Sequence, residues 1–360
     1  MKKLVLTVAM ATLCAGYSAY AQQTAGSPEG GISAEMLSEI SKGYAGDADD
    51  RAIRNALAGS SIATLAVNAD NAAMIDTHFS DRVKTKGITD QQSSGRCWLF
   101  TGLNVLRAKM IDKYDLPGME FSQNYLFFYD QLEKANLFLQ GIIDTKDLPF
   151  EDRKVDWLFS NPLSDGGQFT GVSNLIVKYG LVPSEAMPET YQSNNTSNMA
   201  TLIKLKLREY GLDLREAAAE GASAKKLQKM KVEQLSEVYR MLALCLGEPV
   251  KEFEWEGKTY TPKSFYNEFI GEDLENNYVM VMNDPCREYG KVYEIDYDRH
   301  VYDGHNWLYV NLPVERIKEM AIASSRIILQ CISHATSRSS LTGRRVFLIS
   351  PTLITSPSWA

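Results

Sequence analysis

A cysteine that follows a polar turn is the residue in this chain best suited to chemistry. Cys97 comes directly after the Ser-Ser-Gly-Arg turn at residues 93–96 and begins a segment of mostly apolar residues. The large apolar residues in that segment recur every three or four positions, which predicts a helix buried along one face: Leu99, Leu103, Leu106 and Met110. Cys97 would begin this helix, where unpaired backbone N–H groups favour a negatively charged thiolate, the reactive form of cysteine.

Gln91 lies six residues before Cys97, close enough for its side-chain amide to fold back towards the sulfur. A thiol nucleophile with a nearby amide donor makes up half of an acyl-transfer site. The competing interpretation is that Cys97 is a structural cysteine that packs as a small hydrophobic residue. The local residue types alone leave both interpretations open.

The string DQQSSGRCWLF at residues 90–100 resembles the active-site segment of papain-like thiol proteases, and most closely that of the bleomycin hydrolase and bacterial aminopeptidase C family. One departure is Asp90, where the family usually has Asn. Further blocks that resemble this family follow in order, at residues 121–128, 133–136, 165–168, 179–183, 187–191, 245–249, 265–269 and 320–324. The resemblance therefore extends from about residue 35 to residue 324.

The resemblance implies a cysteine aminopeptidase that removes N-terminal residues from peptides through an acyl-enzyme. Cys97 would be the nucleophile, and Gln91 with the backbone N–H of Cys97 would form the oxyanion hole. Gly166 and Gly167 resemble the glycines that pair with the substrate backbone in papain-like clefts, although a plain glycine turn is an equally open reading. No metal or organic cofactor is implied, peptides are the expected partners, and complete family members form a ring-shaped homohexamer.

Helical patterns come first and strand patterns later, which predicts an α+β fold. The resemblance implies a papain-like cysteine protease fold with a helical insertion and an incomplete sheet lobe. Two long helices, separated at Gly221 and Ser223, would form the insertion. The alternative is that this block is an independent helical domain. In either case helical spacing predicts these buried residues: Leu202, Leu205, Leu235, Val238 and Leu242. We expect these regions: signal peptide 1–21, flexible N-terminus 22–33, helical lobe with the nucleophile 34–189, helical insertion 190–275, start of the sheet lobe 276–324 and non-family tail 325–360.

The N-terminus has the pattern of a secretory signal. Lys2 and Lys3 precede a short apolar run, and an Ala-x-Ala site ends at Ala21, so we expect cleavage there and export to the periplasm or outside the cell. The run is too short to span a membrane. Removing it changes the formal charge from −7 to −9, because two lysines and no acidic residue are lost. Such an acidic chain is poorly suited to nucleic acid or anionic lipid.

The general base that a cysteine protease requires is not evident. The family has a His and an Asn far downstream of the cysteine. Of the four histidines, His78 precedes Cys97, whereas His300 and His305 fall in blocks that resemble non-catalytic parts of the family. His334 is a weak candidate, because it lies closer to Cys97 than the family's spacing and no Asn follows it.

The tail differs in composition from the rest of the chain. No acidic residue follows Glu319, and residues 325–360 do not resemble the family. A basic, Ser-rich linker would explain this composition, but we favour truncation by a reading-frame change near Ser325. The chain is then either a working thiol aminopeptidase with an unusual base, or an inactive family member that serves at most as an interaction module.

Overall fold

The computed structural model describes residues 30–66, 78, 88–116, 118–326, 332–334 and 345–349, of which residues 112, 325, 332–334 and 345–349 are described by their backbone only. The chain divides into two compact units, Met1–His78 and Phe79–Ala360. The predicted signal peptide at residues 1–21 lies outside the described residues, as does most of the predicted tail.

The described part of the first unit contains three helices, α2 (Ala34–Ser41), α3 (Ala48–Gly59) and α4 (Ile62–Leu65). Each begins after a residue whose side chain accepts a hydrogen bond from a backbone N–H of the first turn: Ser33, Asp47 and Ser61. Such N-caps pair donors that the helix itself leaves free. These three helices carry no buried residue, so local capping defines them better than packing does.

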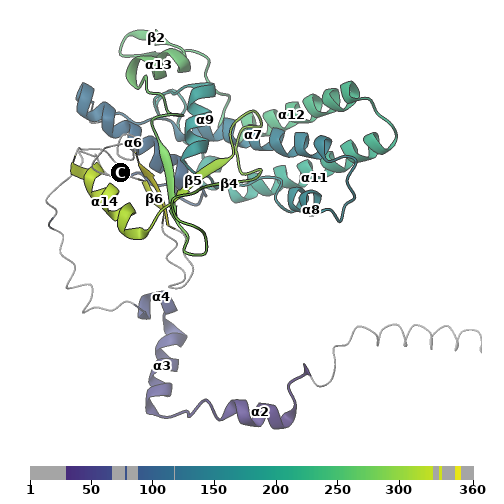
Figure 1. Cartoon of the computed structure of the whole chain (residues 1–360), viewed down its shortest axis with the longest axis vertical. Coiled ribbons are helices and arrows are strands. Elements are labelled where there is room, and N and C mark those ends of the chain that lie inside the picture. The colour runs from purple at the N-terminus through teal and green to yellow at the C-terminus, as the bar shows by residue number, and fades with distance from the viewer. Residues whose placement is uncertain are drawn as a thin grey trace, which may run out of the picture. The chain divides into compact units, whose positions relative to one another are not determined.

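The second unit is mostly helical (Figure 1). Its described helices are α6 (Cys97–Tyr114), α7 (Gln123–Asp144), α8 (Arg153–Ser160), α9 (Phe169–Tyr179), α10 (Tyr191–Asn194), α11 (Ser197–Ala219), α12 (Ala224–Leu246), α13 (Pro262–Phe269) and α14 (Val314–Arg326). Helix α7 is the central one and contacts α6, α8, α9, α11 and α12. Most residues of α7 are buried against these neighbouring helices, among them Phe127, Phe128 and Leu139.

The predicted helix after the polar turn is confirmed. Helix α6 begins at Cys97, and the four predicted core residues are at most 1% exposed: Leu99, Leu103, Leu106 and Met110. The two long helices of the insertion are also present, separated at residues 220–223.

One predicted stripe of the insertion is wrong. Val238 and Leu242 of α12 are fully buried, but Leu202 and Leu205 of α11 are 58% and 57% exposed. Helix α11 instead buries the face next to them, which packs in the same core as α7: Met199, Ile203, Leu207, Tyr210 and Leu214. Both faces have apolar residues at helical spacing, so the pattern could not choose between them.

The described strands begin only after α12, with α13 and α14 among them, which agrees with the α+β prediction. A hairpin pairs β1 (Phe253–Trp255) with β2 (Lys258–Tyr260). The larger sheet has the order β4-β5-β3-β7-β6, with β3 (Val279–Asn283), β4 (Val292–Ile295), β5 (Trp307–Asn311), β6 (Ile332–His334) and β7 (Arg345–Ile349). Strands β3 and β5 are parallel, with Val281 opposite Val310, and the other neighbours are antiparallel.

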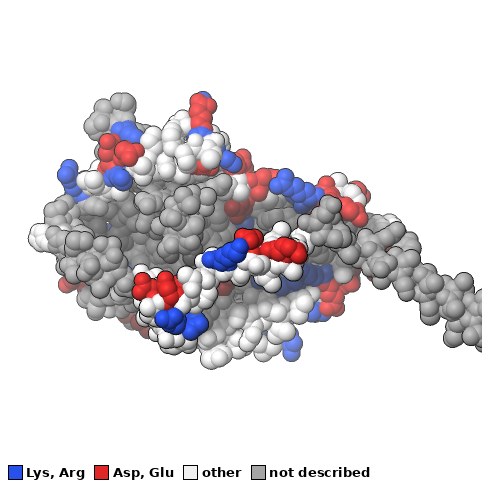
Figure 2. All heavy atoms as spheres, turned by 90° about the horizontal axis from the view of Figure 1, so that it is seen from below, with Lys and Arg blue, Asp and Glu red and all other residues white. Residues whose placement is uncertain are grey.

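The charged side chains are mixed on the face drawn in Figure 2, where the described Lys and Arg residues lie among Asp and Glu residues. Among the described residues on this face, the Lys and Arg side chains thus form no extended basic patch of the kind that binds nucleic acid. Within the described part of the chain, no helix is both long and apolar enough to cross a bilayer.

Candidate active site

Cys97 is the first residue of α6, and its side chain is exposed. Arg96 precedes the helix without capping it through its side chain. In the described part of the chain, the backbone N–H groups of Cys97 and Trp98 have no hydrogen-bond acceptor. An exposed sulfur thus lies at the uncapped, positive end of a helix dipole.

Arg96 anchors this end of α6 in the core. Its side chain is fully buried, and its two terminal nitrogens lie 3.0 and 2.8 Å from the carboxylate oxygens of Glu189. The guanidinium also lies over the rings of Phe100 and Phe127, at 5.0 and 5.2 Å from their centroids. A buried, two-pronged pair of this kind fixes the position of the residue that follows it.

Gln91 lies in a closed turn before the helix. Its side-chain amide donates to the Ser94 carbonyl at 2.6 Å, and the Ser94 hydroxyl donates back to the Gln91 carbonyl at 2.6 Å. The structure thus places Gln91 in the loop that leads to Cys97, with one amide N–H bonded to that loop. The amide has a second N–H, so the turn does not use up its donor capacity.

Asp165 joins the cysteine loop to the predicted glycine segment, about 70 residues away in the chain. Its carboxylate accepts from the Gly95 N–H at 2.8 Å and from the Thr196 hydroxyl at 2.7 Å. Its carbonyl accepts from the Trp98 indole N–H at 2.8 Å. Burial raises the pKa of Asp165, but the hydrogen bonds from Thr196 and Gly95 outweigh it and lower the pKa overall, so the carboxyl stays ionised.

The two predicted glycines have different surroundings. A Cβ on Gly166 would meet no atom within 4 Å, whereas a Cβ on Gly167 would lie 2.3 Å from the His300 ring and 2.7 Å from Trp98. Gly167 therefore permits close packing over the residue next to Cys97. Gly166 faces open space, where another main chain could approach.

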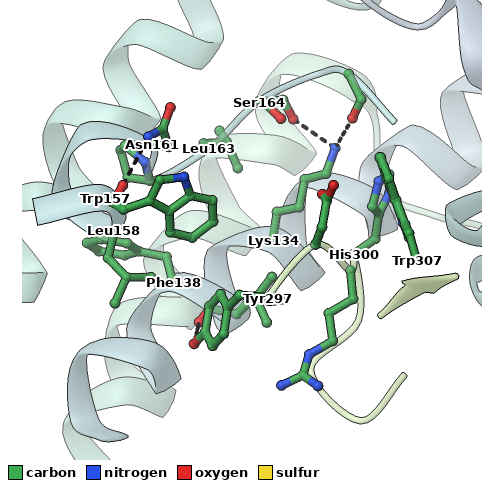
Figure 3. Close-up of a pocket in the computed structure, with 15 residues that line it drawn as sticks. Lys134, Phe138, Trp157, Leu158, Asn161, Leu163, Ser164, Tyr297, His300 and Trp307 are labelled. Carbon is green, nitrogen blue, oxygen red and sulfur yellow. Dashed lines mark hydrogen bonds between the residues drawn. The ribbon is translucent and has the colours of Figure 1, made fainter. Parts of the chain in front are cut away.

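A buried polar cluster, which was not predicted from the sequence, supports this glycine segment. The Lys134 ammonium donates to Asp130 at 2.8 Å, to the Ser164 carbonyl at 2.9 Å and to the Gly166 carbonyl at 2.7 Å, as Figure 3 shows in part. His300 lies 2.6 Å from Asp130 through Nδ1 and meets Trp98 edge-on, with ring centroids 4.8 Å apart. The feature of the sequence that could have indicated this cluster is the pair Asp130 and Lys134, which lie four residues apart in a helix rich in aromatic and aliphatic residues.

The histidines do not complete the site within the described part of the chain, where no hydrogen bond joins the Cys97 thiol to a histidine. Burial lowers the pKa of His300, and its Nδ1 is directed at Asp130. His305 is exposed. The backbone of His334 lies on β6, a strand at the edge of the sheet that contacts α6, but its side chain lies outside the described residues.

Among the residues that the structure describes, no group of three or more His, Cys, Asp or Glu could hold a metal ion. The described cysteines are free: Cys97 and Cys286 are exposed, and Cys245 is partly buried. The chemistry that the arrangement offers is thus that of an exposed thiol at a helix terminus, beside a glycine segment held by buried charges.

Comparison with known proteins gives a consistent result. A model of the Peptidase C1-like family matches residues 31–327. The chain is 39% identical over 260 residues to "Aminopeptidase C" of Lactobacillus delbrueckii subsp. lactis, an alignment that covers 69% of this chain and 58% of that protein. It is 36% identical over 257 residues to "Bleomycin hydrolase" of Rattus norvegicus, which covers 67% of this chain and 56% of that protein.

The structure is similar to the crystal structure of PepW from Lactobacillus rhamnosis, with a TM-score of 0.79 and 31% identity. This match covers 87% of this chain and 73% of the PepW chain. Together with the family match it confirms the predicted α+β, papain-like fold class. The chain spans less than two thirds of the length of the two curated relatives described above.

Proposed function

The chain belongs to the Peptidase C1-like family, as its motifs predicted, and on this basis we propose that it is a cysteine-type aminopeptidase. Relatives with the names aminopeptidase C, aminopeptidase G and bleomycin hydrolase support this activity. The substrates would be peptides with a free N-terminus, and the reaction would release the first residue.

The observation that carries the proposal is the exposed thiol of Cys97 at the uncapped start of α6. In the proposed reaction the Cys97 thiolate attacks the carbonyl of the first residue, the amine of the shortened peptide leaves with a proton, and water hydrolyses the thioester. The free N–H of Cys97 and the second amide N–H of Gln91 would stabilise the oxyanion. Gly166 would accept the substrate backbone alongside it.

The proposed reaction also needs a group that takes the thiol proton. His300 is unsuitable, because it is buried, faces Asp130 and has a pKa lowered by burial. His334 stays the candidate, since the backbone of its strand contacts the helix that begins at Cys97. An inactive chain is the alternative outcome if no base is present.

We also propose that the chain is exported after cleavage following Ala21, on the pattern of residues 1–21. Self-association is proposed for the α11–α12 region, because five of its large apolar side chains are more than half exposed: Leu202, Leu205, Leu212, Val232 and Leu244. Large apolar groups clustered on a surface are typical of interfaces between subunits.

Turnover of aminoacyl fluorogenic substrates by the purified chain tests the activity. Cys97→Ala should abolish release of the fluorophore, whereas Cys286→Ala, which removes the other exposed thiol among the described residues, should leave it unchanged. His334→Ala should lower kcat by more than about tenfold if His334 is the base. Absence of turnover in the unaltered chain, or equal turnover in the Cys97→Ala protein, would overturn the proposal.

A further inference from the structure

A cavity of about 240 Å³ lies beside the glycine segment (Figure 3). Phe138, Trp157 and Leu158 form an apolar wall, and the buried residues Lys134 and His300 lie across from them. Gly166 and Asp298 also line the cavity. Sites for drug-sized ligands usually enclose about 300–1,000 Å³, so this cavity suits one amino-acid side chain or terminus and not an extended peptide.

Asp298 is the acidic group in this cavity that has no partner among the described residues. No described donor bonds its carboxylate, although the side chain is only partly exposed. Burial raises the pKa of Asp298 to about 6, and the nearby Lys134 offsets this only in part. Partial burial of a carboxylate without a partner is costly, and a cationic ligand would relieve that cost.

The other charged and titratable groups of the cavity are already engaged. The Lys134 ammonium has three acceptors and is paired with Asp130, so it has no free proton for a ligand. His300 is neutral near pH 7, because burial lowers its pKa. The Arg299 guanidinium lies over the rings of Tyr297 and Tyr302, at 5.6 and 5.2 Å from their centroids.

We propose that this cavity binds an organic cation of the peptide substrate, an ammonium or guanidinium group, through the Asp298 carboxylate. The inference rests on the proposed peptidase function, because it identifies the substrate class. The cation could belong to a Lys or Arg side chain or to the N-terminal amine, and both sources share the chemistry that Asp298 recognises. Gly166 places the cavity beside the position proposed for the substrate backbone.

Calorimetric binding to the Cys97→Ala protein tests the cavity without any turnover. Three probes separate the sources: L-lysine amide has both cations, N-acetyl-L-lysine amide has only the side-chain ammonium, and L-norleucine amide has only the terminal one. Asp298→Asn should weaken binding of the probe with the correct cation by about tenfold or more. The matched control Asp296→Asn removes an exposed acid two residues away and should change none of the affinities.

Loss of N-acetyl-L-lysine amide binding in the Asp298→Asn protein would show that Asp298 binds the side-chain ammonium of the substrate. Loss of L-norleucine amide binding would show that it binds the N-terminal amine. The affinity of the chain with intact Asp298 should also fall as the pH decreases through about 6, because the carboxylate becomes neutral, and this fall should be absent in the Asp298→Asn protein. Equal affinities in the Asp298→Asn and Asp296→Asn proteins would overturn the inference. Because the binding assay needs no catalysis, an inactive chain that still binds through Asp298 would refute only the proposed function.

Discussion

His300 and Asp130 meet in the core of the second unit, with Nδ1 of the imidazole 2.6 Å from Oδ1 of the carboxylate. The two residues come from the loop between β4 and β5 and from the middle of α7, and both are at most 3% exposed. The imidazole fills the space above Gly167 and Gly171, where no Cβ would fit. This contact therefore joins the loop between β4 and β5 to α7, next to the glycine segment.

The buried His300 should make the protein less stable in mild acid. Burial lowers its pKa in the folded state, so as the pH falls below about 6.5 the unfolded chain takes up a proton that the folded chain does not. The free energy of unfolding should therefore decrease as the pH falls from 7 to 5. Thermal unfolding at a series of pH values measures this slope.

Two variants test whether His300 causes this dependence of stability on pH: His300→Gln removes the buried imidazole, and His305→Gln is the control. His300→Gln should lower stability at pH 7 by about 2 kcal/mol and flatten the slope. His305 is exposed, so its replacement should preserve the slope. An unchanged slope in the His300→Gln protein would show that another group titrates. Asp130, whose pKa is lowered, affects stability in a different pH range, because its contribution to the free energy of unfolding is lost only well below pH 5.

Lys134 should contribute strongly to the stability of the fold. Lys134→Met leaves the fully buried Asp130 without its cation and frees the carbonyls of Ser164 and Gly166, so we expect a loss of about 3–5 kcal/mol in unfolding free energy. Adding Asp130→Asn to Lys134→Met should restore part of this loss. The control Lys146→Met removes a surface pair with Asp147, which is worth about 0–1 kcal/mol. Equal losses in the two single variants would contradict the assigned role.

The two neighbouring glycines provide a test that separates packing from binding. Gly167→Ala should cost about 1–3 kcal/mol, because its Cβ would overlap the rings of His300 and Trp98. Gly166→Ala should change stability by less than about 0.5 kcal/mol, because its Cβ would enter open space. Gly166→Ala should instead raise KM for peptides. A Gly166→Ala protein with unchanged KM would argue against a role for this residue in substrate binding.

The sequence predicted the parts of the site that depend on local pattern. Cys97 and the four apolar residues that follow its turn lie on one helix, and helical spacing alone identifies its buried face. The prediction failed for Leu202 and Leu205, because α11 has two apolar stripes and only the position of α7 decides which is buried. The cluster of Asp130, Lys134 and His300 could not be found locally, since His300 is 166 positions after Lys134 in the chain.

The exposed leucines of α11 give a further test. If copies of the chain associate through this helix, Leu202→Glu with Leu205→Glu should reduce the solution mass to that of a monomer, as measured by light scattering, because a buried charge at an interface is costly. Ile53→Glu, which alters an exposed apolar residue of the first unit, should leave the mass unchanged. A monomeric unaltered chain would exclude association through these residues.

The central claim is that the sulfur of Cys97 becomes acylated by the substrate. The most direct measurement is peptide mapping by mass spectrometry after the purified chain has reacted briefly with an aminoacyl 4-nitrophenyl ester and been quenched in acid. We predict an aminoacyl thioester on the peptide that contains Cys97 and none on the peptide that contains Cys286, the other cysteine that is exposed in the described part of the chain. Equal labelling of both peptides, or a thioester on Cys286 alone, would contradict it.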